Sequence, residues 1–180
     1  MIRYIYLLLL SVIPIRINAQ EVVECNATVF IGMDYGRAIY VYPDAFATLG
    51  TELFAVRNNL DEEWYVSLRI KGRTPNMFFC DFFDMAGDCC YIGEGWIRKE
   101  HLSVLLRFPY QHHEFKLYKT PNSSGGITCC INDSEEYVVT VVDAMGSWLK
   151  VKVENGENVN VGWLAPENQC SDLYSACCGE

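Results

Sequence analysis

The sequence has few basic residues, few histidines and no long apolar run, and each shortage disfavours a class of protein. Lys and Arg number 14 against 23 Asp and Glu, which gives a formal net charge of −9. Proteins that bind nucleic acid need a basic surface that releases counterions from phosphates, so this class is disfavoured. The 180 residues also contain no Gly-x-Ser-x-Gly, His-Glu-x-x-His or phosphate-loop motif. The sequence therefore predicts no enzyme, no cofactor and no metal site.

The main apolar run lies at the N-terminus and is too short to cross a bilayer. After Arg3, the segment IYLLLLSVIPI is mostly apolar over about 11 residues, whereas a spanning helix needs about 20. Charged, apolar and small-residue stretches follow one another as in a secretory signal peptide, with cleavage expected after Ala19. Removing residues 1–19 leaves 12 basic and 23 acidic residues, a net charge of −11. We expect a mature chain that is secreted or periplasmic and does not insert into the membrane.

Nine cysteines are many for an exported chain of this length and favour disulfide bonds. Three pairs are directly adjacent, and neighbours on a strand point to opposite faces, which disfavours convergence on one zinc ion. The candidates for disulfide bonds are Cys80, Cys89, Cys90, Cys129, Cys130, Cys170, Cys177 and Cys178. We expect Cys80 to pair with Cys89 or Cys90 across a hairpin, and one of the last three cysteines to pair with Cys129 or Cys130. The alternative is that the adjacent cysteines are small buried residues that stay reduced.

Two segments open on the same Gly-Trp-aliphatic step, which indicates a repeated structural unit. The step occurs at Gly95–Trp96 and, 67 residues later, at Gly162–Trp163. Short β-branched and aromatic segments with turn signals surround both steps, a pattern typical of small all-β sandwiches and barrels. Glycine would allow another backbone to approach closely, and the tryptophans are expected to close the core. The alternative is that they form an exposed aromatic platform.

The strand pattern is clearer in the second half, where strands are expected at 136–143, 148–153 and 161–165. The first half is expected to follow the same order: 38–47 matches 115–124, 51–58 matches the strand before Asp143, and 62–70 matches the strand that starts near Trp148. On this alignment the first half has about 17 extra residues. We expect these Phe- and Cys-rich residues, at about 72–92, to form an inserted hairpin.

The run YVVTVVD, a turn, WLKVKV, a Gly-containing hairpin and GWLAPE resemble the bacterial Src-homology-3-like (SH3-like) domain family. The resemblance covers about 115–173 and, more weakly, 38–106. It implies an all-β fold of two tandem small SH3-like β-barrels, each half-open, the first with the inserted hairpin. The expected regions are a signal peptide at 1–19, a first domain at 20–107, and a second at 108–180 that includes a Cys-rich C-terminal tail. The second unit is expected to fold alone from about 115 to 173.

The resemblance also implies a binding role, commonly toward cell-wall peptide or glycan in exported bacterial proteins. We therefore expect a non-enzymatic module that holds a peptide or peptidoglycan-type ligand on aromatic surface residues. The candidate ligand-binding residues are Tyr40, Tyr42, Asp61, Glu62, Glu63, Trp64, Tyr118 and Trp148. The alternative is a periplasmic inhibitor or interaction protein that docks a partner through an acidic surface and the Phe-rich segment MFFCDFFD at 77–84. Those phenylalanines could otherwise fill the gap between the two units.

Overall fold

The computed structural model describes residues 22–32, 38–47, 51–59, 64–85, 90–106, 114–132, 138–155 and 158–171, so the expected signal peptide lies outside the described residues. Within these ranges the fold is all-β, as the sequence predicts, with 3-10 turns and no α-helix. No helix in this part of the chain is long and apolar enough to cross a membrane. The strands are β1 (Val23–Ile31), β2 (Ile39–Val41), β3 (Phe54–Val56), β4 (Val66–Arg73), β5 (Met77–Asp84), β6 (Cys90–Arg98), β7 (Leu102–Leu106), β8 (Glu114–Tyr118), β9 (Ile127–Asn132), β10 (Val138–Met145), β11 (Trp148–Asn155), β12 (Asn158–Leu164) and β13 (Gln169–Cys170), and the 3-10 turns are η2 (Lys99–His101) and η3 (Pro166–Asn168).

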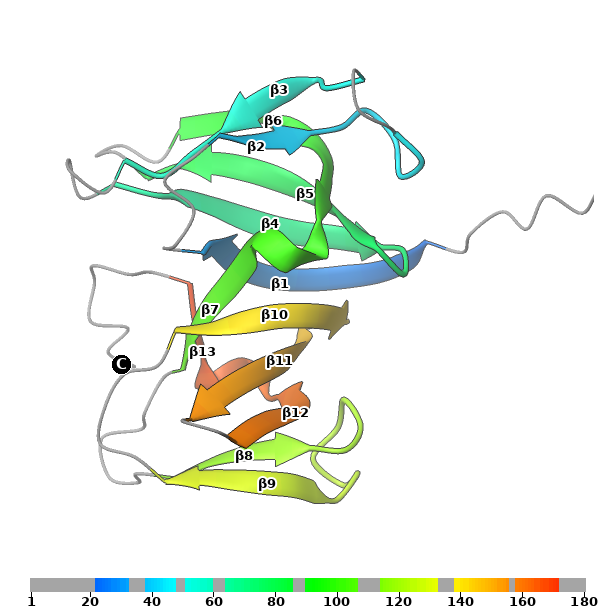
Figure 1. Ribbon diagram of the computed structural model, residues 1–180. Helices are drawn as coiled ribbons and strands as arrows, with labels where there is room; N and C mark the ends of the chain where they lie inside the picture. Colours follow the sequence, from blue (N-terminus) through cyan, green and yellow to red (C-terminus); the bar gives the residue numbers. More distant parts are fainter. Residues whose placement is uncertain are drawn as a thin grey trace, which may run out of the picture.

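One antiparallel sheet of 11 strands runs through the whole molecule (Figure 1). Its order is β6-β5-β4-β1-β7-β10-β11-β12-β8-β9, and β13 also pairs with β7. The hairpin of β2 and β3 forms a separate two-stranded sheet that meets β6 through a bridge between Tyr42 and Trp96. The path has two ends, β6 and β9, and no pairing among the described strands closes it into a ring.

Strands β4, β5 and β6 form a meander, called here the first meander, in which alternate residues face the core. On β5, Phe78, Cys80 and Phe82 are fully buried, whereas Phe79 and Phe83 are only partly buried. Residues 77–84 do pair with β6 as a hairpin, but they are not an insertion, because they form an interior strand that also pairs with β4. The Phe-rich alternation fits that position because one face of the strand is buried and the other faces solvent.

Strands β10, β11 and β12 form a second meander with the same pairing pattern. The register of β4 against β5 shifts between Ile70 and Gly72, and that of β10 against β11 shifts between Val141 and Asp143. A 3-10 turn and a short strand follow each meander: η2 and β7 after the first, η3 and β13 after the second. The strands expected at 136–143, 148–153 and 161–165 correspond to β10, β11 and β12.

The two Gly-Trp steps occupy the same place in the two meanders. Gly95 lies opposite Cys80 and approaches the crossing strand β2 so closely that an added Cβ would meet the Val41 side chain and lie 3.0 Å from the Tyr42 carbonyl oxygen. Gly162 lies opposite Val151, and its Cβ would lie 2.7 Å from Leu117 Cβ and 3.3 Å from the carbonyl oxygen of Tyr118 on β8. Both glycines therefore permit close backbone approach, as the sequence predicts.

The tryptophans of these steps differ in burial. Trp163 is only 7% exposed, but it lies opposite Lys150, whose Nζ is 6.0 Å from the centroid of its ring, so it faces the outer side of the second meander and not the main core. Trp96 is only partly buried, and its ring lies 5.3 Å from that of Phe79, between centroids. The prediction that both tryptophans close the core is therefore wrong, because each lies on the outer face of its meander, Trp96 opposite Phe79 and Trp163 opposite Lys150.

The alignment of the two halves drawn from the sequence is correct at one end and wrong in the middle. The hairpin β2–β3 occupies the place of β8–β9, since β2 meets β6 and β8 meets β12 at the Gly-Trp steps. Residues 51–58 therefore contain β3, not the counterpart of β10. That counterpart is β4, because β4 and β10 are the first strands of the two meanders.

Strand β7 connects the two halves. It pairs with β1, β10 and β13, and all five of its residues are buried. The sheet is thus continuous through β7, which lies directly before the expected domain boundary at 107/108. The main hydrophobic core includes buried residues from both meanders. A smaller cluster of Phe30, Tyr65, Leu105 and Cys170 joins β1 and β7 to β13.

Candidate functional site

Two of the candidate ligand-binding residues meet on the second half of the molecule. Tyr118 ends β8 and Trp148 begins β11, and their rings meet edge to face, with centroids 5.5 Å apart and an interplanar angle of 87°. Both side chains are partly exposed, and the neighbouring Met145 is 40% exposed. We call Tyr118 and Trp148 the aromatic pair. Edge-to-face geometry is a preferred arrangement of aromatic rings, and here it leaves surface available to a ligand.

The turn before Trp148 is held by its backbone. Gly146 has φ +56°, a conformation that L side chains rarely adopt, so glycine suits this turn. The Asn26 amide donates a 2.7 Å hydrogen bond to the Gly146 carbonyl oxygen, and the Gln169 side-chain amide donates one of 3.0 Å to the Ser147 carbonyl oxygen. Trp148 therefore projects from a turn that is anchored on both β1 and β13.

The corresponding place in the first half lacks such a pair. Met77 begins β5 as Trp148 begins β11, and it is buried. Tyr42, which bridges to Trp96, is also buried. The expectation that Tyr42 offers a binding surface is therefore wrong, because this side chain is packed inside.

Among the described residues, the other candidates are not gathered with the aromatic pair. Tyr40 is 48% exposed and lies on β2. Trp64 is partly buried and packs against the core, and its backbone exchanges two 3.1 Å hydrogen bonds with Asn59. The acidic residues Asp61, Glu62 and Glu63 lie outside the described residues. The described candidates thus do not meet at one site.

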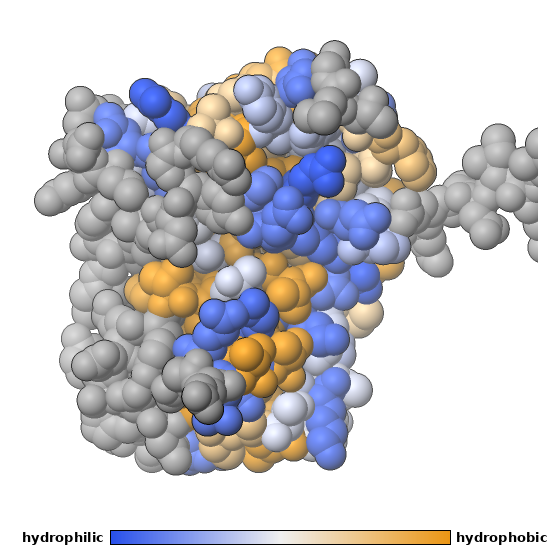
Figure 2. Space-filling model, in the orientation of Figure 1, coloured by the Kyte–Doolittle hydropathy of each residue, from blue (hydrophilic) through white to orange (hydrophobic). Residues whose placement is uncertain are grey.

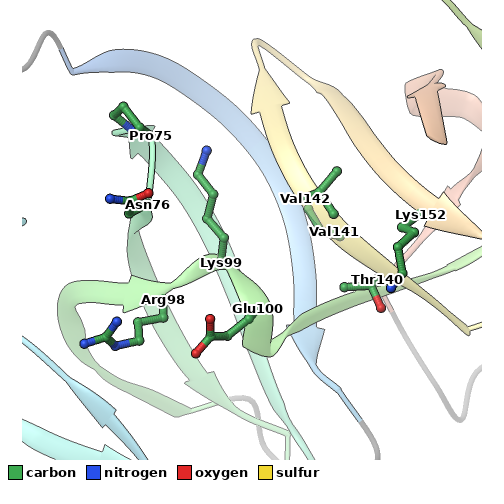
Figure 3. A pocket seen from close by; sticks show the side chains of 9 residues that line it. All are labelled: Pro75, Asn76, Arg98, Lys99, Glu100, Thr140, Val141, Val142 and Lys152. Atoms are coloured by element: carbon green, nitrogen blue, oxygen red, sulfur yellow. The ribbon is translucent and has the colours of Figure 1, made fainter.

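A groove that sequence reasoning missed lies between the two meanders (Figure 3). Its volume is about 620 Å³. One side comes from the β4–β5 turn and η2, the other from β10 and β11. Figure 2 shows hydrophilic and hydrophobic residues side by side near the middle of the molecule in the orientation of Figure 1. The groove is lined by Pro75, Asn76, Arg98, Lys99, Glu100, Thr140, Val141, Val142 and Lys152.

An ion cluster joins the two meanders beside this groove. Asp143 Oδ1 lies 2.7 Å from Lys99 Nζ and 3.3 Å from Arg73 Nη1, so one carboxylate faces two cations. The Lys99 side chain is 12% exposed, and its Nζ lies 4.8 Å from the centroid of the Phe78 ring. Arg73 Nε is buried without a hydrogen-bond partner among the described residues. The cluster therefore holds more positive than negative charge at the junction.

The cysteines do not form the expected bonds. Cys80 and Cys90 have free thiols, because Cys80 lies opposite Gly95 and Cys90 lies opposite Asp84, at the far end of the strand pair. Cys129 and Cys130 are also free, so neither holds the tail. Cys170 is disulfide-bonded. Cys89, Cys177 and Cys178 lie outside the described residues.

The thiols of Cys25, Cys80, Cys129 and Cys130 are poor nucleophiles. Burial raises the pKa of the Cys25, Cys80 and Cys129 thiols, and a hydrogen bond with Glu114 is the main cause that raises the pKa of Cys130. Because the thiolate is the reactive form, a raised pKa lowers reactivity at neutral pH. No group of three or more His, Cys, Asp or Glu side chains that could hold a metal ion occurs in the described part of the chain.

The aromatic pair and the groove offer surfaces for binding, and comparison with known proteins assigns no function to either. No protein-family model, no curated protein and no solved structure matches the chain. The function is therefore inferred from the geometry of the aromatic pair and of the groove.

Proposed function

We propose that the protein is a non-enzymatic binding module built of two SH3-like units that share β7. The first unit has the order β6-β5-β4-β1-β7, and the second has the order β12-β11-β10-β7-β13. In both, the first meander strand pairs with the strand that precedes the unit's hairpin, and the strand after the 3-10 turn pairs with that same strand. The matching register shifts and Gly-Trp steps support the repeat. Each unit is a half-open barrel of the kind that the family resemblance implies.

Sharing explains why β7 is buried along its whole length. It is the last strand of the first unit, where Ser103 pairs with Phe30 of β1. It is also the opening strand of the second unit, where Leu105 pairs with Val138 and with Cys170. In this proposal the first domain keeps its expected range of 20–107 and ends with β7. The second domain includes β7 in addition to residues 108–180.

The ligand site of this module is the aromatic pair, and its ligand is a peptide or a peptidoglycan-type fragment. The observation that carries this proposal is the partly exposed edge-to-face contact of Tyr118 and Trp148, set beside the exposed Met145. Exposed aromatic side chains offer large, rigid contact area to extended peptides and account for much of the affinity where they bind. The module acts outside the cytoplasm after loss of residues 1–19.

A second candidate function has its own observation. The outer face of the first meander carries Phe79 and Phe83, and Tyr91 beside them is 58% exposed, with its ring centroid 5.8 Å from that of Phe83. This face could dock a partner protein, as an inhibitor would. Cations partly cover it, since Lys71 Nζ lies 4.8 Å from the Phe79 ring and Arg69 Cζ lies 5.6 Å from the Phe83 ring. Among the residues that the structure describes, no cation lies over the rings of the aromatic pair, which is the stronger site.

Retention on purified peptidoglycan, and titration with its soluble glycopeptide fragments, test the proposal. We expect Trp148→Ala to weaken binding by roughly tenfold or more, as removal of an aromatic anchor does. Tyr40→Ala, which removes an exposed aromatic side chain from the first unit, is the matched control and should leave binding unchanged. Equal binding by the wild type and a folded Trp148→Ala variant contradicts the proposal. Loss of binding in Tyr91→Ala instead favours the docking face.

A further inference from the structure

We propose that the groove between the two meanders is a second binding site, which takes a carboxylate-bearing peptide segment. It combines three cationic side chains with apolar walls at the junction of the two halves, in a chain whose overall charge is negative. The groove shares no residue with the aromatic pair. This site is therefore an addition to the proposed function and can fail without it.

The charges favour a ligand with carboxylates. Arg98, Lys99 and Lys152 line the groove, and Arg73 is linked to Lys99 through the Asp143 carboxylate. Asp143 faces both Arg73 and Lys99, so one negative charge is shared by two positive ones. Lys152 contacts Glu154 at 2.5 Å, and Glu100 is the acidic lining residue. Four cations, Arg73, Arg98, Lys99 and Lys152, thus face the three carboxylates Asp143, Glu154 and Glu100. The one positive charge that remains suits a single carboxylate and not a polyanion, which the acidic chain would repel.

The shape and the walls favour a peptide segment over a bare ion. A volume of about 620 Å³ lies in the range of sites that hold organic ligands, roughly 300–1,000 Å³. Pro75 and Val142 provide apolar contact, and Asn76 and Thr140 provide amide and hydroxyl groups beside the cations. In Figure 3, Lys99 points into the space between the Pro75–Asn76 turn and β10, where Val142 lies. An extended segment with alternating aliphatic and acidic side chains matches both properties.

Position also matters, because the groove is formed by both halves. Arg98 and Lys99 come from the end of β6 and from η2, and Lys152 comes from β11. Guanidinium groups bind carboxylates through paired hydrogen bonds, so Arg98 is suited to fix the orientation of the acidic side chain. A bound segment would therefore contact both meanders at once.

The test uses the full mature chain and three probes. These are the capped peptide acetyl-Val-Glu-Val-Glu-amide, its counterpart with both Glu replaced by Gln, and inorganic phosphate. Nuclear magnetic resonance titration follows the backbone amides and yields the dissociation constant. Arg98→Gln and Lys152→Gln are the test variants, and Lys116→Gln, an exposed lysine on β8, is the matched control. Lys99 is left unchanged because its removal would leave Asp143 with one cation fewer at the junction.

We expect the Glu peptide to shift the amides of η2 and β10 and to saturate at millimolar concentration or below. Each test variant should weaken it about tenfold, the effect of losing a hydrogen bond to a charged group, and Lys116→Gln should not. The Gln peptide should not saturate. Equal binding of the Gln peptide, equal weakening by Lys116→Gln, or the absence of saturable shifts overturns the proposal. Phosphate binding as tight as that of the peptide would show a simple anion site and also overturns it. Binding that is lost in Trp148→Ala but not in Arg98→Gln would place the peptide on the aromatic pair instead.

Discussion

The two meanders pair their strands in the same register around the Gly-Trp steps, with one additional shift between Phe82 and Phe83 in the first, but they differ in what they expose. Facing the core, Phe78, Cys80 and Phe82 of β5 occupy the places of Leu149, Val151 and Val153 of β11, and all six are buried. On the outer face, Phe79, Asp81 and Phe83 stand where the second meander has Lys150, Lys152 and Glu154. The inward pattern is therefore what specifies the meander, and the outer face can change from aromatic to charged without altering the pairing.

The residue paired with each Gly-Trp tryptophan shows the same change from aromatic to charged: it is Phe79 in the first meander and Lys150 in the second. In the first meander the ring of Trp96 meets Phe79 at 5.3 Å, and in the second the ring of Trp163 meets Lys150 Nζ at 6.0 Å. Both are attractive contacts to an aromatic ring, by ring packing and by a cation–π interaction. The tryptophan is common to both, and its outer partner differs. Three predictions test how far the likeness between the two meanders extends.

The largest effect is expected from removing β7 from the second unit. A fragment of residues 114–171 lacks the strand that pairs with Val138, Val139 and Thr140 and with β13, so we expect no cooperative unfolding. A fragment of residues 102–171 retains β7 and should unfold cooperatively. Circular dichroism during thermal and urea unfolding measures both. Cooperative unfolding of the shorter fragment with the same midpoint would show that the second unit is complete without β7, as the sequence alone suggested.

The next effect concerns the glycines of the two Gly-Trp steps. Gly95→Ala and Gly162→Ala should each lower the free energy of unfolding by about 1–3 kcal/mol, because the new Cβ overlaps Val41 in one case and Leu117 in the other. Val161→Ala, next to Gly162 and 40% exposed in the wild type, is the control and should stay within about 0.5 kcal/mol. Urea unfolding of the whole chain measures all three. A cost at only one glycine would mean that the two crossings are not equivalent.

The sequence predicts much of this fold and one part of the site. Alternation predicts β10, β11 and β12, the Gly-Trp steps predict the two crossings, and Tyr118 and Trp148 are each named as candidates. The middle of the first half was misread because both Trp64 and Trp148 precede apolar runs, which suggested that they correspond. The structural counterpart of Trp148 is the buried Met77, and a methionine at that place gives no such signal.

The groove could not be predicted for a different reason. Arg73, Lys99 and Asp143 lie on β4, η2 and β10, and they meet only because both meanders pack on either side of β1 and β7. No local pattern in the sequence encodes that proximity. The same holds for the cysteines: spacing predicts a bond from Cys80 to Cys89 or Cys90, but strand register decides which residues face each other.

The smallest effect concerns an ion pair that only the first meander has. Lys71 lies at the register shift of β4, where the second meander has Val142, and its Nζ lies 2.8 Å from Asp81 and 2.6 Å from Glu94. Hydrogen bonds to Asp81 and Glu94 raise the pKa of Lys71 from 10.5 to about 12. Because the raised pKa belongs to the folded state, the stabilisation is fully present below pH 10.5 and disappears as the pH rises toward 12. Lys71→Gln should therefore lower the free energy of unfolding by at most about 1 kcal/mol at neutral pH, since exposed ion pairs are screened by solvent.

Urea unfolding of the wild type and of Lys71→Gln, from neutral pH to pH 12, measures the difference between them. We expect it to be constant up to about pH 10.5 and then to shrink, because the wild-type lysine loses its charge and the variant has none to lose. Lys119→Gln, on the second half, controls for the general effect of alkali on the protein. A difference that persists at pH 12 would assign the effect to the packing of the Lys71 side chain on the Phe79 ring, 4.8 Å from Nζ, and not to its charge. In that case the outer faces of the two meanders would differ in apolar contact alone.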